Sequence, residues 1–487
     1  MMSAQSLARR YGLPVLLATI GSFAMLIAGI GTGTVPARAA GSAGHWSTAQ
    51  PIAGLPAVSA GISAVNSISC TSPGNCTVGG GYIRPSNFTS AAFLVRERDG
   101  AWGKPDEILS PKPRSDLSGA WINSVSCGAP GNCSAVGEYV DANYLSHALV
   151  ISEQNGRWGA LIPVRGASLA GGGAASITAV SCRSAGTCSA AGIYSETAAG
   201  KYWVFVVDER SGQWGKAELI AGPAGAGAQV SALSCGSPGN CVVGGDVVPN
   251  GDGHNQAFVA SERDGRWSPA RSVPGLAALN QGHFAGIASV ACPSASQCVV
   301  AGTYQGLPAD HPFVVTEANG RWGTAAEIPG TAKLASASAT VLSCPSAGNC
   351  VAGLADGVGQ SFLVSQRNGH WDKPIAIPGI ARLAGGRASS PVISELSCPS
   401  AGNCGAAGVF SVAPGDESGA FVAAELHGSW GTAIEVPGLA NLNRGKRAAI
   451  DAISCPAAGQ CIAGGYYAPI ADGQPADDGS TFLTIRS

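Results

Sequence analysis

Short stretches of alternating apolar and polar residues recur along the chain at a nearly constant spacing. One form, as in "NSVSC" and "TAVSC", ends at a cysteine and has an apolar residue two positions before it. A second form, as in "CSAVGEY" and "CVVAGTY", begins at a cysteine, and a third reads "FVVTE" or "FVASE". Alternation over such short lengths predicts β-strands.

Turn-forming residues separate these strands. Five residues such as "PSAGN" join the first form to the second. Asn-Gly or Asp-Gly joins the third form to a fourth, which begins "NGRWG" or "DGRWS", and these dipeptides favour a tight two-residue hairpin. Each unit is therefore predicted to contain four short antiparallel strands.

The cysteine pairs show how many repeat units the chain contains. Sixteen cysteines fall into eight pairs with five residues inside each pair, and the first cysteines of successive pairs lie 52–57 residues apart. Such a period predicts a repeat architecture. The expected fold is all-β, an eight-bladed β-propeller of four-stranded antiparallel blades. Separate sandwiches are disfavoured because about 55 residues is small for an independent core, and a β-helix has shorter repeats.

The two ends of the chain complement each other. The last unit stops after its third strand, in "STFLTIRS" at residues 480–487. Near the N-terminus, "GHWSTAQPI" at residues 44–52 aligns with the fourth-strand segment "GHWDKPIAI" at residues 369–377. We therefore expect the strand that contains Trp46 to complete the eighth blade, which closes the ring and protects its sheet edges.

The N-terminal residues resemble an export signal. Two arginines and the apolar run of residues 13–30 precede "VPARAA", which has the small residues of a cleavage site. This pattern predicts a signal peptide over residues 1–39, one propeller domain over residues 40–487, and a secreted, extracellular protein with no membrane partner after cleavage. Because the apolar run is longer than a usual signal core, an uncleaved membrane anchor remains an alternative.

The charge pattern excludes one class of partner. The net charge is −2, only 12% of the residues are charged, and no basic stripe is present. Nucleic acid is therefore not an expected partner. We expect a monomer.

Each cysteine pair flanks a predicted hairpin turn, which places the two Cβ atoms opposite each other at a separation that suits a disulfide. An exported protein is oxidised. The rival interpretation is eight metal sites, but each would have two local thiolates, no histidine recurs in phase, and structural zinc takes four ligands. We expect no metal and no cofactor. The predicted disulfides are Cys70–Cys76, Cys127–Cys133, Cys182–Cys188, Cys235–Cys241, Cys292–Cys298, Cys344–Cys350, Cys398–Cys404 and Cys455–Cys461.

Two further residue types recur with the repeat. A Trp opens each fourth strand, and we expect these residues to pack between blades rather than to form a binding ladder. A Glu ends the third strand of six units and should lie opposite the Trp in a structural role. The Trp series is Trp46, Trp102, Trp158, Trp214, Trp267, Trp322, Trp371 and Trp430, and the Glu series is Glu97, Glu153, Glu209, Glu262, Glu317 and Glu425.

The segments "LSCPSAGNCVAG" and "SERDGRW" resemble the secreted, cysteine-containing propeller repeats of actinobacterial proteins, which are loosely sialidase-like. The resemblance covers nearly the whole chain after residue 39 and implies a secreted propeller. The chain departs from sialidases themselves, because Asp264 lies only three residues before Trp267, closer than in their Asp-box. The arginine triad and tyrosine nucleophile of sialidases have no assignable positions here.

Candidate ligand-binding residues lie in the connections that vary between units. These are the loops between second and third strands and the links from one unit to the next, which should share one face of the ring. His147, His254 and His311 stand just before third strands, with Asp252 and Asp310 beside two of them. Such residues can serve as metal ligands or acid–base groups. The alternative is that they are exposed polar loop residues.

Two functions remain open at this point. The favoured one is a non-enzymatic binding propeller for glycans or cell-envelope proteins. The other is a glycoside hydrolase or lyase of sialidase-like type with its site at the mouth of the central channel. An enzyme of that kind requires two carboxylates from different blades to converge at the mouth.

Overall fold

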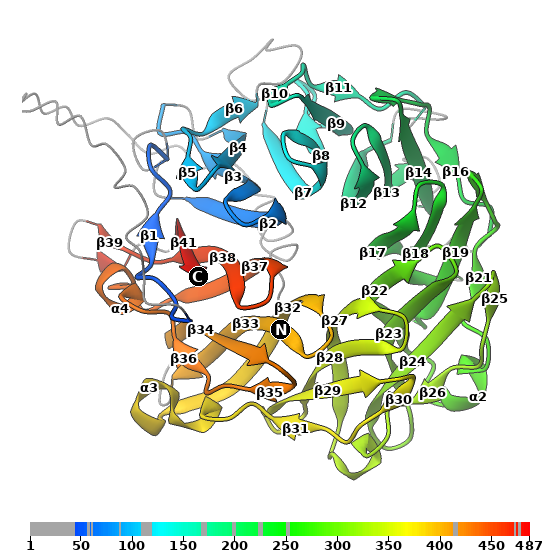
Figure 1. Ribbon diagram of the computed structural model, residues 1–487. Helices are drawn as coiled ribbons and strands as arrows, with labels where there is room; N and C mark the ends of the chain where they lie inside the picture. The colour runs from blue at the N-terminus through cyan, green and yellow to red at the C-terminus, as the bar shows by residue number, and fades with distance from the viewer. Residues whose placement is uncertain are drawn as a thin grey trace, which may run out of the picture.

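The computed structural model describes residues 44–55, 59, 62–86, 89–108, 119–166, 173–196, 201–222, 227–249, 254–412, 417–471, 474–475 and 479–487. The predicted signal peptide lies outside these residues. Eight antiparallel sheets stand in a ring around a central axis (Figure 1). This arrangement confirms the predicted eight-bladed β-propeller.

The first strand of each blade lies at the centre of the ring and the following strands lie progressively outward (Figure 1). Each inner strand contacts the next one, and β37 contacts β2, so the ring is closed. The inner strands are β2 (Ser63–Ser72), β7 (Ala120–Ala129), β12 (Ala175–Ser184), β17 (Gly227–Ser237), β22 (Ala285–Ser294), β27 (Ala337–Ser346), β32 (Ala388–Ser400) and β37 (Ala448–Ala457).

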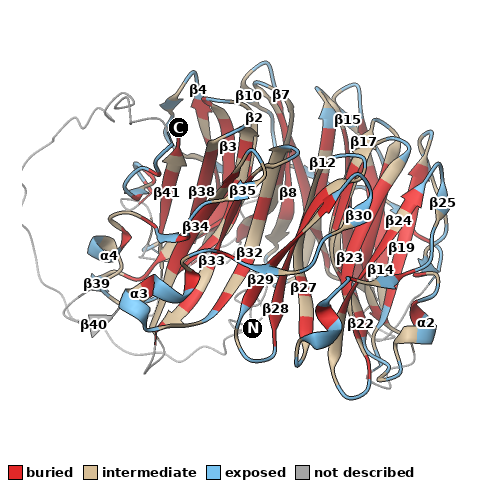
Figure 2. Ribbon diagram, turned by 60° about the horizontal axis from the view of Figure 1, so that its bottom comes forward, coloured by how far each residue is buried: buried red, intermediate tan, exposed pale blue. Residues whose placement is uncertain are grey.

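The two middle strands of each blade carry most of the buried residues (Figure 2). The second strands are β3 (Asn75–Ile83), β8 (Asn132–Val140), β13 (Thr187–Glu196), β18 (Asn240–Val248), β23 (Gln297–Gln305), β28 (Asn349–Asp356), β33 (Asn403–Val412) and β38 (Gln460–Tyr467). The third strands are β4 (Ser90–Arg98), β9 (Ser146–Gln154), β14 (Lys201–Arg210), β19 (Gln256–Arg263), β24 (Asp310–Ala318), β29 (Ser361–Arg367), β34 (Glu417–Leu426) and β41 (Ser480–Arg486).

The outer strand of blades 1–7 is divided into two short pieces, both of which pair with the third strand. The first pieces are β5 (Ala101–Trp102), β10 (Arg157–Trp158), β15 (Gln213–Trp214), β20 (Arg266–Trp267), β25 (Arg321–Trp322), β30 (His370–Trp371) and β35 (Ser429–Trp430). The second pieces are β6 (Asp106–Ile108), β11 (Ile162–Pro163), β16 (Glu218–Leu219), β21 (Arg271–Ser272), β26 (Ala326–Glu327), β31 (Ile375–Ala376) and β36 (Ile434–Glu435).

A few short helices, turns and one hairpin lie in the connections between strands. They are the helices α2 (Leu276–Leu279), α3 (Leu383–Gly386) and α4 (Leu439–Leu442), the 3-10 turns η1 (Thr331–Lys333) and η2 (Ile380–Arg382), and the hairpin of β39 (Ile470–Ala471) and β40 (Gln474–Pro475). The described part of the chain contains no helix long and apolar enough to cross a membrane.

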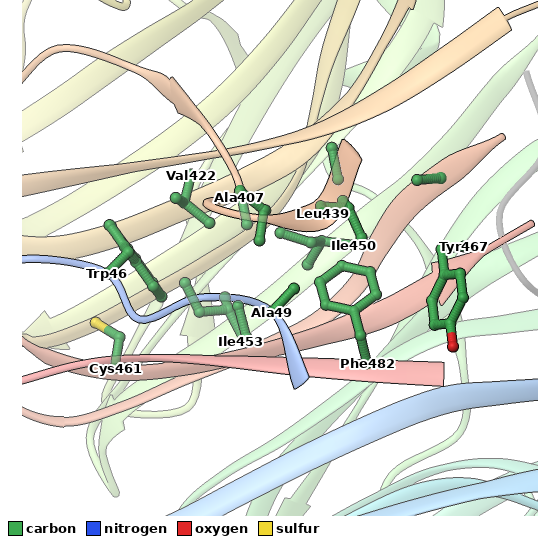
Figure 3. Close-up of a cluster of buried hydrophobic side chains, with 14 of the residues drawn as sticks. Trp46, Ala49, Ala407, Val422, Leu439, Ile450, Ile453, Cys461, Tyr467 and Phe482 are labelled. Carbon is green, nitrogen blue, oxygen red and sulfur yellow. The ribbon is translucent and has the colours of Figure 1, made fainter. Parts of the chain in front are cut away.

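The N-terminal strand completes blade 8, as predicted. Strand β1 (Gln50–Pro51) pairs with β41, and Trp46 forms a β-bridge with Arg486. The Trp46 side chain is only 8% exposed and lies beside Ile453 and Cys461 (Figure 3). Residues more than 400 positions apart in sequence therefore share one sheet.

The hydrophobic core consists of layers between adjacent blades. Among the described residues, eight clusters fill the eight interfaces, and each contains one Trp of the repeated series. Trp102, for example, packs with Val65 of blade 1 and with Ile462 and Leu483 of blade 8. The predicted interblade packing of these residues is confirmed.

The eight predicted disulfides are all present and lie on one face of the ring. Their Cα–Cα separations are 3.9–4.1 Å, and the described residues include no free cysteine. On this face the two hairpin turns of a blade touch, since the backbone N–H of Gly100 donates to the carbonyl oxygen of Gly74. We call this the disulfide face, and we call the opposite face, made by the variable connections, the loop face.

Candidate functional site

Three segments of the loop face lie side by side over blades 4 and 5. The backbone N–H of Ala285 donates to the carbonyl oxygen of Asn255 at 2.9 Å, and the N–H of Gln305 donates to that of Phe284 at 2.7 Å. These bonds join three segments: the end of the loop between β18 and β19 in blade 4, the link from blade 4 to blade 5, and the loop between β23 and β24 in blade 5. We call the result the blade 5 loop surface, made of residues 254–255, 282–285 and 305–311.

Large apolar side chains on this surface are open to solvent. Phe284 is 45% exposed and Leu307 is 71% exposed. Within the described part of the chain, the other exposed large apolar residues lie on the loop face or on the outer strands, and none lies in the turns of the disulfide face. Exposed apolar residues that gather at one place mark interaction sites. They are Tyr144, Val358 and Ile470 on the loop face and Ile162, Ile375 and Ile434 on the outer strands.

Two histidines stack on the same surface. The ring centroids of His254 and His283 are 5.0 Å apart, the rings are inclined by 19°, and both residues are exposed. The neighbouring Asn255 donates from Nδ2 to Oδ2 of Asp246 at 3.1 Å, which holds the base of this loop. The structure thus adds His283 and Phe284 to the predicted His254, whereas the predicted Asp252 lies outside the described residues.

His311 stands at the edge of the blade 5 loop surface with partners of its own. Its ring stacks on Tyr304 with centroids 5.4 Å apart, and its Nδ1 lies 3.6 Å from Oε1 of Glu327. Burial, together with Glu327, raises the pKa of Tyr304. Asp310 is half-buried, and its backbone N–H donates to Oγ of Ser336 at 3.2 Å. His311 and Asp310 therefore help to fix the loop as well as lying beside the exposed residues.

His147 is not part of this surface, because it belongs to blade 2 and the surface lies over blades 4 and 5. Its Nε2 lies 2.9 Å from Oδ2 of Asp141, and its ring stacks on Tyr139 with centroids 5.0 Å apart. The hydrogen bond from His147 lowers the pKa of Asp141, and backbone N–H groups of the loop, including that of Leu145, contribute. The predicted histidines thus divide into two places on the loop face.

Sequence reasoning missed two acids on the inner strands. Each inner strand has a bulge, and in five blades the bulged side chain donates to a backbone carbonyl of the next blade. The amide of Asn66, for example, donates to Ile122 at 2.7 Å. In blade 8 this position holds Asp451, and in blade 7 the residue after the bulge is Glu395.

Among the described residues of the eight inner strands, Glu395 and Asp451 are the only carboxylates, and they come from adjacent blades. Burial raises the pKa of Asp451 to about 7. Burial, followed by the charge of Asp451, raises the pKa of Glu395 well above its usual range. Oδ2 of Asp451 is buried without a hydrogen-bond partner. An alignment of the eight repeats could have found Glu395 and Asp451, because the other units carry uncharged residues at these two positions.

The disulfide face has clefts between blades. One of ≈ 230 Å³ lies between blades 1 and 2, and one of ≈ 300 Å³ lies between blades 6 and 7. Glu97 and Glu153 line the first cleft and Glu425 lines the second. Each repeated glutamate lies opposite its Trp as predicted, for example Glu97 opposite Trp102. Each is at most 5% exposed. Most contact the preceding blade, as Glu153 contacts Arg96 at 3.0 Å, which supports their structural interpretation.

No group of three or more His, Cys, Asp or Glu side chains that could hold a metal ion occurs among the described residues. The blade 5 loop surface therefore offers exposed rings, apolar side chains and a few polar groups rather than a charged cage. Surfaces of this composition hold ligands by stacking and by a small number of placed hydrogen bonds.

The chain matches no protein-family model and no curated protein. Its fold is similar to solved propellers at low identity. One is Sqt1 of Chaetomium thermophilum bound to the N-terminus of a ribosomal protein, with a TM-score of 0.47, 12% identity and coverage of 88% of this chain and 97% of that one. Another is a neuraminidase-like protein from a flat-faced bat isolate, with a TM-score of 0.33, 12% identity and coverage of 63% and 86%.

A third similar structure is a prolyl endopeptidase, with a TM-score of 0.44, 11% identity and coverage of 84% of this chain. The chain spans about half of that protein's length, 54%. These three similarities concern the fold alone.

Proposed function

We propose that the protein is an extracellular, non-enzymatic propeller that binds glycans or cell-envelope proteins through the blade 5 loop surface. The observation that carries this proposal is the gathering of Phe284, Leu307 and the His254–His283 stack on three segments joined by backbone hydrogen bonds. Eight disulfides support an oxidising, extracellular setting.

The chemistry of the surface favours a ligand with apolar faces and scattered polar groups. Aromatic and imidazole rings contact the C–H faces of sugars or the apolar side chains of a protein. Asp310 and His311 lie at the margin and accept or donate hydrogen bonds. The disulfides stabilise the opposite face, so the sequences of the loops can vary without destabilising the propeller.

A screen of glycans and cell-envelope extracts against the mature chain tests the proposal. Once a ligand is found, Phe284→Ala and the double variant His254→Ala/His283→Ala should each weaken its binding at least about tenfold. The melting temperature should change little, since these side chains are exposed. Tyr144→Ala, which removes an exposed ring from blade 2 on the same face, is the matched control and should bind normally.

Replacing residues 248–256 and 305–311 with Gly-Ser segments should abolish binding. If binding survives both replacements and is lost when the "PSAGN" turns of the disulfide face are altered, the ligand binds the opposite face and the proposal is wrong.

A second candidate function, a glycoside hydrolase, is favoured by one observation. Glu395 and Asp451 break the repeat, lie on adjacent inner strands and have raised pKa values. Glycoside hydrolysis uses a pair of carboxyl groups, one of which acts as a general acid with a raised pKa. Incubation with labelled glycans decides between the two functions, since an enzyme releases products and loses that activity in Glu395→Gln, whereas a binding protein releases none.

A further inference from the structure

The repeated glutamates of the third strands are buried, and for most of them the preceding blade supplies partners. Glu209 accepts hydrogen bonds from Oγ of Ser134 at 2.7 Å and from Oγ of Ser152 at 2.5 Å. Glu317 accepts from Oγ of Ser261 at 3.1 Å and pairs with Arg263 at 2.5 Å. A buried carboxylate requires such partners, because its desolvation otherwise goes uncompensated.

Three positions of the preceding blade provide these donors. One lies on the second strand directly after its cysteine, as Ser134 does. The other two flank the Glu position on the third strand, as Ser152 and Arg263 do. In blades 3 and 5, donors at these positions of the preceding blade reach the carboxylate.

Glu425 of blade 7 has no such hydrogen bond at Oε2. Burial raises its pKa, and the charge of Arg367 opposes that shift only in part. The first position in blade 6 holds Val351, which has no donor, and the second and third hold Ser365 and Arg367. Arg367 instead places its Nε 3.4 Å from Oδ2 of Asp372 and donates from Nη2 to the carbonyl oxygen of Gly428 at 3.4 Å. Glu425 is 2% exposed, and its Oε2 has no hydrogen-bond partner.

Glu425 also lines the larger of the two interblade clefts. This cleft of ≈ 300 Å³ lies between the turns of blades 6 and 7, with Asn349, Asn368 and His427 among its other lining residues. Its volume is at the lower end of the range for small-ligand sites. The unpartnered carboxylate oxygen thus belongs to a residue that borders a space of ligand size.

We propose that this cleft binds a primary ammonium group, of an amino sugar or of a lysine side chain, with Glu425 as its counter-charge. An ammonium offers three N–H donors from one compact cation and needs a single carboxylate. A divalent metal needs several ligands, and the described residues offer no cluster of three at any place. The site lies on the disulfide face and does not depend on the blade 5 loop surface.

The test is a calorimetric titration of the mature chain with matched ligands. Glucosamine and N-acetylglucosamine differ in the ammonium, as do Nα-acetyl-lysine amide and its Nε-acetylated form. At least one ammonium ligand should bind at least about tenfold more tightly than its acetylated twin. The pair in which the ammonium form binds more tightly shows whether the natural ligand is an amino sugar or a lysine side chain. Equal binding within both pairs, or none, overturns the proposal.

Three variants locate the site. Glu425→Gln should remove the preference for the ammonium while the melting temperature stays constant or rises, because a buried charge is lost. Glu209→Gln, the equivalent change where Ser134 and Ser152 already satisfy the carboxylate, should keep the preference. Arg367→Ala should keep or strengthen binding, since it removes the nearest competing cation. Loss of binding in Glu209→Gln or in Arg367→Ala refutes the assignment to Glu425.

Discussion

The backbone N–H of Cys127 donates a hydrogen bond to Oγ of Ser69 in the preceding blade, with the two atoms 3.0 Å apart. The edge of an inner strand that faces the centre of the ring has no further strand to pair with, so the serine satisfies a group that would otherwise need water. Six further blade junctions repeat the bond, and at one of them Cys70 and Ser454 join blade 1 to blade 8. The recurrent "SC" of the sequence is therefore a contact between blades.

Blade 5 carries Ala291 at the serine position, which gives the first prediction. Ala291→Ser should raise the free energy of unfolding by about 0.5–1.5 kcal/mol, because it supplies the missing acceptor to the N–H of Cys344. Ser69→Ala should lower it by a similar amount. Urea unfolding of both variants measures the effect. Equal stabilities for the two would show that these serine hydrogen bonds between blades do not stabilise the fold.

The closure of blade 8 depends on Trp46. Trp46→Ala should lower the free energy of unfolding by about 3–5 kcal/mol, because a buried indole between blades 7 and 8 is lost and the pairing with β41 is weakened. His45→Ala removes the exposed neighbour and should change little. Thermal melts of both variants test the closure, which an unaltered melt of Trp46→Ala would contradict.

Each disulfide should contribute independently to the free energy of unfolding. Replacing Cys127 and Cys133 together by serine should lower the free energy of unfolding by about 2 kcal/mol, the value expected for a loop of about seven residues. Non-reducing peptide mapping of the unmodified chain should recover eight short linkages. Linkages between different repeats, or free thiols, would contradict the structure.

Stability should fall as the pH rises. The pKa values of Asp451 and Glu262 are raised to about 7, mainly by burial, whereas unfolded carboxyls titrate near about 4. Between these values the folded state binds more protons, so the free energy of unfolding decreases through this window. Urea unfolding at pH 5.5 and pH 8 should show this decrease.

Asp451→Asn isolates one contribution to that dependence. Asparagine donates at the bulge position, as Asn66 does in blade 1, without needing a proton from solution. The variant should be more stable than the parent at pH 8 and should depend less on pH. Glu395 and Tyr466 both interact with Asp451 and should titrate differently in the variant. An unchanged pH dependence would assign it to other groups.

Much of the fold follows from local, repeated signals. Alternation, Asn-Gly or Asp-Gly turns and the Cys-x5-Cys spacing act within a few residues of each other, so they predict the strands, the hairpins and the disulfide pairs. Eightfold repetition then determines the number of blades, and the match between residues 44–52 and 369–377 predicts the closing strand. The pairing of Glu97 with Trp102 likewise follows from a two-residue hairpin.

The contacts between blades were decided by the tertiary structure alone. They join residues about 55 positions apart on sheets that pack face to face, and the alternation within a strand does not say which side chains of two neighbouring sheets meet. Glu425 looks like every other glutamate of its series, but its neighbours are Val351 and an arginine paired with Asp372. In the same way Phe284 and His283 join His254 only because the link between blades 4 and 5 folds beside the loop, where a backbone hydrogen bond from Ala285 to Asn255 holds it.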